Sequence, residues 1–301
     1  MDHNTFDKKG TIKYLVWTFL IAWVLQVIAA VLSRNGHAAV GRLLISVVMF
    51  APLLGVLLSG QPLSGMGWKP RLKGKVKILL AAWFLPALLT AVGAALYFVV
   101  FPGHFDLSGE YLVSAAGAEL LEQLEAQGLT YPVYILISVV GCLTYAPLVN
   151  MLLAAGEEAG WRGILYPQLK VKFGKRKGWL IGGVIWGIWH WPLIWLIGYE
   201  YGTDYVGFPI VGMLIFCIFT TAAGILCDWL YEKSECIWIP SIVHGAINAA
   251  GTVPLAVCAA NTGSAILLGP APIGILAGLP LIICAGVLLF TAVKPEGSQG
   301  E

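Results

Sequence analysis

The chain has 301 residues, of which 58% are hydrophobic and only 11% are charged, whereas roughly a quarter of the residues in an ordinary soluble domain are charged. Eighteen basic and 16 acidic side chains leave a net charge of +2, so no strong positive field indicates a nucleic-acid partner, and the apolar content excludes a disordered chain. The composition therefore predicts a membrane protein.

Charge-poor apolar segments recur along the chain. A helix needs about 20 such residues to cross a bilayer core of roughly 30 Å. We predict an all-α, polytopic fold with about eight membrane-spanning helices, near residues 12–32, 40–59, 78–101, 132–155, 178–197, 206–226, 237–257 and 265–293. The chain is interpreted as one transmembrane domain, 1–301. It divides into N-terminal spans with an acidic loop (1–131), a motif-bearing core (132–257), and a last span with a tail (258–301).

The basic residues predict the orientation, because Lys and Arg gather on the cytoplasmic side of membrane proteins. With eight spans, all of them except Arg34 and Arg42 fall on one side. They are Lys8, Lys9, Lys13, Lys69, Arg71, Lys73, Lys75, Lys77, Arg162, Lys170, Lys172, Lys175, Arg176, Lys177, Lys233 and Lys294. We therefore expect a multi-pass protein of the cell membrane with both termini in the cytoplasm.

Residues 106–130 are expected on the opposite side of the membrane. This segment carries five acids and no Lys or Arg. The acids are Asp106, Glu110, Glu119, Glu122 and Glu125. Its leucines recur at helical spacing, which predicts a short helix lying on the bilayer surface.

The cysteines and two glycines of the chain are expected to serve helix packing rather than chemistry. Cys142, Cys217, Cys227, Cys236, Cys258 and Cys284 include no CxxC pair, so a disulfide scaffold is excluded and we expect them to pack as small apolar residues. Gly183 and Gly187 form a small face that suits close contact either within the chain or between copies.

Two histidines lie inside predicted spans, where an ionisable group costs roughly 2.5 to 3.5 kcal/mol on insertion and is a candidate for function. They are His190 and His244. Trp186 precedes the first by four residues and Asn248 follows the second by four, so each pair shares a helix face. The simpler alternative for such a histidine is an interhelical hydrogen bond.

Two adjacent acids, Glu157 and Glu158, end the fourth apolar segment. On a helix they point about 100° apart and cannot do the same work. Glu158 can pair with Arg162 one turn later, which leaves Glu157 free to face the bundle. The alternative is a charge pair at a helix end on the membrane surface.

Together, Glu157, His190, His244 and Asn248 could activate water, because they supply a carboxylate base, two imidazoles and an amide donor for an oxyanion. Two histidines and a glutamate are also a zinc-hydrolase ligand set, although HExxH is absent and water or Asn248 would have to complete it. A transporter or channel using these groups as a proton or ion relay is the alternative function.

The three segments resemble the CPBP family of intramembrane proteases, also called the Abi family, which includes CAAX-processing Ras-converting endopeptidases and bacteriocin-related proteins. The family pattern is EExxxR, FxxxH and HxxxN. Glu157, Glu158 and Arg162 match the first motif, His190 matches the second with Trp186 where Phe is usual, and His244 and Asn248 match the third. The resemblance covers about residues 148–251.

The resemblance implies proteolysis of a membrane-associated peptide or protein. Glu157 and His190 would activate water, His244 and Asn248 would stabilise the oxyanion or complete a metal site, and Trp186 would contact the substrate. One divalent metal such as zinc, held by Glu157, His190 and His244, and a metal-free glutamate mechanism both stay open. So does a non-enzymatic role as a bacteriocin-immunity protein.

Helix lengths give an estimate of depth. At 1.5 Å per residue, His190, His244 and Asn248 lie about 18, 10 and 16 Å from the cytoplasmic end. A straight fourth helix would carry Glu157 to the surface, so either Pro147 bends it or residues 160–169 stay buried and the chain returns to water near Pro167. We favour the second alternative, which predicts a cavity open to the cytoplasm.

Overall fold

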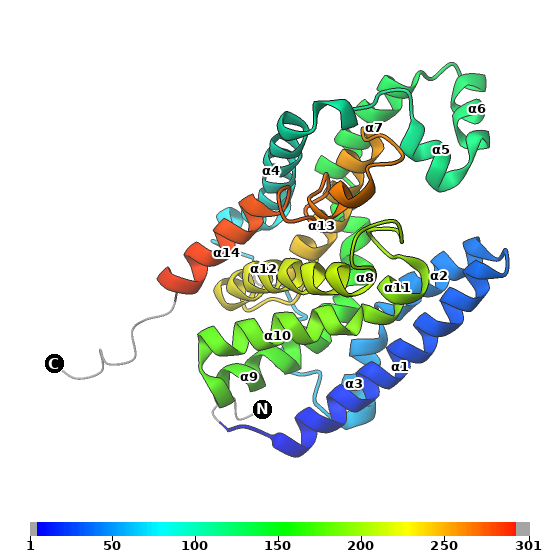
Figure 1. The fold of residues 1–301 in the computed structure, drawn as a ribbon. Coiled ribbons are helices and arrows are strands. Elements are labelled where there is room, and N and C mark those ends of the chain that lie inside the picture. Colours follow the sequence, from blue (N-terminus) through cyan, green and yellow to red (C-terminus); the bar gives the residue numbers. More distant parts are fainter. Residues whose placement is uncertain (1–4, 71, 293–301) are drawn as a thin grey trace.

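The computed structural model describes residues 5–70 and 72–292, and every regular element in that part of the chain is helical (Figure 1). The expected all-α, polytopic fold is confirmed. Four helices are long and apolar enough to cross a membrane. They are α1 (Lys8–Arg34), α4 (Val76–Val100), α10 (Lys175–Trp189) continued by α11 (Trp191–Ile197), and α12 (Ile210–Ser234).

Two bent helix pairs raise the candidate spans in the described residues to six. The first joins α2 (Ala38–Val48) to α3 (Ala51–Ser59) at 45°. The second joins α7 (Tyr131–Leu143) at 55° to a stretch made of α8 (Ala146–Gly160), a π-helical turn (Trp161–Leu165) and α9 (Tyr166–Phe173).

The last two expected spans are α13 (Trp238–Ala256) and α14 (Leu279–Thr291). Both are helical, but α14 has only 13 residues and α13 contains polar side chains that lower its hydropathy, so neither is among those six. Residues 265–278 are mostly non-helical, because Pro270 and Pro272 remove backbone donors. Arg71 and Lys294 of the charge pattern, and Val293 at the predicted end of the last span, lie outside the described residues.

The acidic segment forms two short helices rather than one. These are α5 (Glu110–Ala116) and α6 (Ala118–Ala126). They are separated by Gly117, whose φ of 91° is a conformation that favours glycine and interrupts a helix.

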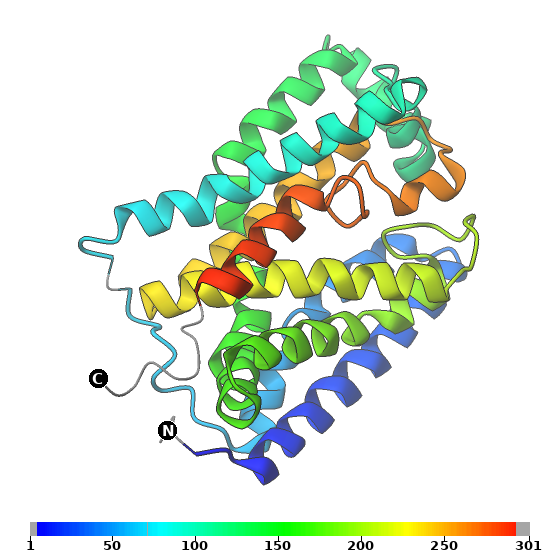
Figure 2. The ribbon, with the colours of Figure 1, turned by 60° about the vertical axis from the view of Figure 1, so that its left-hand side comes forward.

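Three helices bring the motif segments together. α12 packs on α10, α13 and α14, whereas α8 packs on α13 and α3. Figures 1 and 2 show α12 between α10 on one side and α13 and α14 on the other. Helices α8 and α13, which carry Glu157 and His244, therefore pack directly on each other, and α12 connects α13 to α10, which ends at His190.

The two ends of the bundle differ in charge. At one end, on the left of Figure 2, the starts of α1, α4 and α10 meet the ends of α12 and α14. There Lys175 Nζ lies 2.6 Å from a Glu232 carboxylate oxygen, and Arg176 Nε donates to Leu289 O at 3.1 Å. We call this the lysine-rich end.

The opposite end carries the acidic helices. Asp106 N donates to Val257 O at 3.0 Å, and Ala260 N donates to a Glu110 carboxylate oxygen at 3.4 Å. These bonds attach the acidic segment to the C-terminal end of α13, and we call this region the acidic end. The observed separation of charge agrees with the loop pattern except at Arg162, which is completely buried inside the bundle rather than in a loop. The orientation relative to the cytoplasm stays a prediction.

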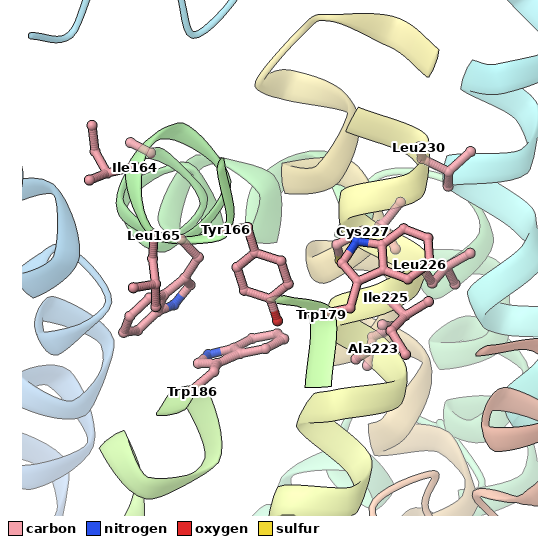
Figure 3. Close-up of a cluster of buried hydrophobic side chains, with 14 of the residues drawn as sticks. Ile164, Leu165, Tyr166, Trp179, Trp186, Ala223, Ile225, Leu226, Cys227 and Leu230 are labelled. Carbon is pink, nitrogen blue, oxygen red and sulfur yellow. The ribbon is translucent and has the colours of Figure 1, made fainter. Parts of the chain in front are cut away.

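A dense cluster of buried side chains fills the bundle beside the lysine-rich end (Figure 3). Trp161, Leu165 and Tyr166 are fully buried there and pack with Trp179 and Leu226. We call this set the buried cluster. The expected burial of residues 160–169 is thus observed over most of that range. The chain also bends just before Pro147, so both alternatives for the fourth segment hold together.

Candidate active site

A cavity of about 300 Å³ lies between α2, α8, α10, α12 and α13. Four of the predicted catalytic residues line it, together with Trp186. The four are Glu157, His190, His244 and Asn248. The expected intramembrane cavity is therefore present, and the side chains from three separate helices face the same space.

Close backbone contact between α8 and α13 helps to assemble the site. A Cβ on Gly245 would lie 2.6 Å from Met151 N and 2.7 Å from Pro147 O, which is closer than any larger residue allows. Glycine at this position lets the two helices touch and brings His244 beside Glu158.

Glu158 and Arg162 form a buried pair behind the cavity wall. Glu158 Oε1 accepts from Arg162 Nη1 at 3.0 Å, which agrees with the predicted pairing one turn apart. The guanidinium carbon lies 4.6 Å from the Tyr166 ring centroid and 4.7 Å from that of Trp186. Both side chains are completely buried, so each charge depends on the other for stabilisation.

The same Glu158 oxygen also holds the imidazole of His244. Glu158 Oε1 lies 2.8 Å from His244 Nδ1. A carboxylate on one ring nitrogen fixes the ring orientation and leaves the other, Nε2, for a further partner. Because His244 lines the cavity, we interpret Glu158 and Arg162 as the groups that position His244.

Glu157 has a different environment from its neighbour. Its Oε2 accepts from Trp161 Nε1 at 3.0 Å and from Trp186 Nε1 at 2.8 Å. It forms no ion pair with any described residue, although the side chain is only 2% exposed. Neutral indole donors can orient a carboxylate without forming an ion pair with it, so Glu157 is a candidate base.

Trp186 therefore lines the cavity and also donates a hydrogen bond to Glu157. Its ring also lies 5.2 Å from that of His244 in an edge-to-face arrangement. Trp161 was not predicted as a site residue, although it follows Glu157 by four positions, as Arg162 follows Glu158. That spacing was the signal that could have found it.

His190 lies at the C-terminal end of α10, where the chain turns into α11. Its Nδ1 lies 3.0 Å from Trp186 O. Its ring is 4.7 Å from that of Phe216 and stacks on Tyr199 at 6.3 Å. Asn248, one turn beyond His244 on α13, is exposed to the space of the cavity.

Two further cavity residues, Tyr199 and Glu200, belong to the loop between α11 and α12. Glu200 has a φ of 71°, which is uncommon for a non-glycine residue and is often found at functional sites. Burial raises the pKa of the Glu200 carboxyl. The Glu200 carboxylate, with burial, raises the pKa of the Tyr199 hydroxyl. An acid directly after an apolar span was the signal for Glu200 in the sequence.

The suggested metal ligands do not form a ligand set. In residues 5–70 and 72–292, no three His, Cys, Asp or Glu side chains are arranged to hold a metal ion. Glu157 Oε2 is already bound by two indoles, and His244 Nδ1 is bound by Glu158. Glu157, His190 and His244 therefore do not fit the tetrahedral site that zinc requires.

The cavity lining does not extend to the lysine-rich end, where the sequence predicts the opening; the side of the membrane on which that end lies stays a prediction. The buried cluster fills the bundle there, whereas the cavity continues past Thr252, Leu255 and Glu200 toward the acidic end. The helix-depth estimate placed the side chains inside the membrane, but it could not show on which side large residues leave space.

Residues 138–250 match the Rce1-like family of type II CAAX prenyl endopeptidases. A curated relative, "CAAX prenyl protease 2" of Methanococcus maripaludis, is 30% identical over 107 residues, which are 35% of this chain and 39% of the relative. The chain thus matches about two fifths of that relative's length. Both similarities support the CAAX protease family that the three motifs indicated, and the matched residues run from α7 to α13.

Proposed function

We propose that this chain, a CAAX protease family member by its residues 138–250, is an intramembrane endopeptidase that hydrolyses a peptide bond in a membrane-associated substrate. One observation carries the proposal. A buried carboxylate with no cationic partner among the described residues, Glu157, faces the same cavity as two imidazoles and the amide of Asn248. A water molecule and a peptide carbonyl placed there would meet a base and hydrogen-bond donors together.

Glu157 is the proposed general base. It would take a proton from water as the oxygen attacks the carbonyl carbon, and would later return that proton to the leaving amine. His190, held through Nδ1 on Trp186 O, would orient the same water with its other nitrogen.

His244 and Asn248 are the proposed oxyanion donors. His244 would act in its imidazolium form, because its Nδ1–H donates to the Glu158 carboxylate and only the doubly protonated ring has a second donor at Nε2. His244 Nε2–H and the Asn248 side-chain amide would then donate to the oxygen as negative charge develops on it. Removing one donor of this kind costs about 10²- to 10³-fold in kcat. Glu158 and Arg162 would act through His244 and are positioning residues.

The proposed mechanism uses side chains alone, because the candidate ligand set does not fit a metal. We expect cleavage by the purified protein to survive prolonged treatment with a metal chelator. Loss of activity in chelator, restored by zinc alone, would contradict the metal-free mechanism and return Glu157, His190 and His244 to consideration as ligands.

The central test is the Glu157→Gln variant in proteoliposomes with a set of fluorogenic membrane peptides. Gln keeps the size and can still accept from both indoles, but it is not a base, so we expect kcat to fall by about 10²- to 10⁴-fold without loss of folding. Glu125→Gln, a change at an exposed acid of α6, is the matched control.

Unchanged cleavage by the Glu157→Gln variant would remove this residue from catalysis. Proton or ion flux that depends on His190, without peptidase activity, would favour the relay instead. Protection from a bacteriocin that survives Glu157→Gln would favour an immunity role.

A further inference from the structure

The exposure of α13 changes along its length. Ser241 is completely buried and His244 is only 6% exposed, whereas Asn248 and Thr252 are both exposed. The last three residues all line the cavity. Space for water is therefore found along the half of α13 that leads to the acidic end.

Other residues of the cavity mouth lie at the same end. Tyr199 and Glu200 belong to the loop after α11. Arg34 Nη2 donates to Leu196 O, which ties the end of α1 to the end of α11. Arg34 is one of the two basic residues that the sequence assigns to the non-cytoplasmic side.

The lysine-rich end is closed by tightly packed side chains. Trp161, Tyr166 and Trp179 are fully buried in the buried cluster, and Figure 3 shows Tyr166 and Trp179 within it. Trp161 and Tyr166 follow Glu157 along the chain toward that end. Behind them, the fully buried carboxylate of Asp228 accepts from Lys170 Nζ and from Trp179 Nε1, each at 2.6 Å. These bonds join α9, α10 and α12, and none of the residues that form them lines the cavity that Glu157 faces.

Charge assigns the two ends to the two sides of the membrane. Most of the lysines in the described part of the chain lie in segments at the lysine-rich end, whereas the charged residues of α5 and α6 are all acidic. Because Lys and Arg near span ends are retained in the cytoplasm, the lysine-rich end is cytoplasmic and the acidic end is extracytoplasmic.

We infer that the cavity is entered from the extracytoplasmic side. If the chain is the proposed endopeptidase, its substrate is then a peptide segment at the outer surface of the membrane or in the outer half of the bilayer, rather than a tail presented from the cytoplasm. The substrate class depends on the proposed function, whereas the side of access depends only on packing and charge.

The experiment is cysteine accessibility in whole cells and in inside-out vesicles, with a small membrane-impermeant thiosulfonate as the probe. Thr252→Cys reports the cavity, Glu122→Cys the exposed acidic end and Lys73→Cys the exposed lysine-rich end. The unmodified chain is the blank, because its cysteines are buried except Cys284, which is half-buried. The protein is then denatured and treated with a thiol reagent that shifts its mobility on a gel. A cysteine that the probe has already modified does not react, so the loss of the gel shift measures modification.

We expect Thr252→Cys and Glu122→Cys to be modified in whole cells, and Lys73→Cys only in inside-out vesicles. Modification of Thr252→Cys only in inside-out vesicles would overturn the inferred access. Modification of Glu122→Cys only in those vesicles would overturn the orientation, and no modification of Thr252→Cys in either would show that the cavity is closed. None of these readouts needs catalysis, so failure of the inferred access and failure of the proposed peptidase are distinguishable.

Discussion

At the scale of single residues, the two adjacent acids Glu157 and Glu158 differ in the groups that bind their carboxylates. Glu158 shares one oxygen between the Arg162 guanidinium and His244, whereas Glu157 receives only two indole N–H groups. A carboxylate paired with a cation is a weaker base than one held only by neutral donors. The structure thus gives the two neighbours different proposed roles, one in chemistry and one in positioning.

The indole donors should matter for rate. A hydrogen bond to a charged group is worth about 1.5–3 kcal/mol, so Trp161→Phe and Trp186→Phe should each lower kcat by about tenfold or more, with a smaller effect on KM. Trp238→Phe, which removes a bond to Trp68 O outside the cavity, is the control. Full activity in both site variants would mean that Glu157 does not depend on this orientation.

Glu200 should make stability depend on pH. Burial raises the pKa of its carboxyl in the folded protein above the ordinary value of a glutamate, so the folded state loses stability as pH rises through that ordinary value toward the folded-state pKa. Glu200→Gln should therefore raise the Tm of the detergent-solubilised protein at pH 8 and leave it unchanged at pH 4. An equal gain at both pH values, or none at pH 8, would contradict this, and Glu125→Gln should change neither.

Close helix contacts through small residues hold the elements in register. The glycines of α10 that the sequence offered for either intrachain or intermolecular packing face α12 within the same chain. A Cβ on Gly183 would lie 2.3 Å from Thr221 Cα, and one on Gly187 would lie 2.6 Å from Cys217 Sγ. The contact sets the position of α10, and with it Trp186 and His190.

Gly183→Ala tests this contact. The new methyl group would clash with the backbone of α12 at Thr221, which can move only if the whole helix shifts. We therefore expect a loss of about 1–3 kcal/mol in stability, measured as a lower Tm in detergent. Gly286→Ala on α14 is the control, because its Cβ would meet no atom within 4 Å. Equal stability of the two variants would show that α10 and α12 can separate without cost.

The whole molecule combines a closed, basic end with an open, acidic one. Large aromatic side chains fill the first, and the cavity occupies the middle and leads to the second. This asymmetry restricts where a substrate can enter. It follows from how the helices pack rather than from the chemistry of Glu157, so an inactive variant should keep the same access.

The sequence by itself determined the membrane class, the all-α fold, the positions of the apolar segments and four of the polar residues that line the cavity, namely Glu157, His190, His244 and Asn248. These features depend on local composition and on i,i+4 spacing, and both can be read from a single segment of the sequence. The pairing of Glu158 with Arg162 belongs to the same category, since the two residues lie one turn apart.

Only the tertiary structure decided which carboxylate binds His244, which indoles hold Glu157 and at which end the cavity opens. His244 and Glu158 are 86 positions apart, and Trp186 and Glu157 are 29 apart. Contacts of this kind depend on the angle and depth at which separate helices pack, and on where bulky side chains fill space. The hydrophobic pattern of one helix contains no information on its packing angle, on its depth or on the side chains of its neighbours.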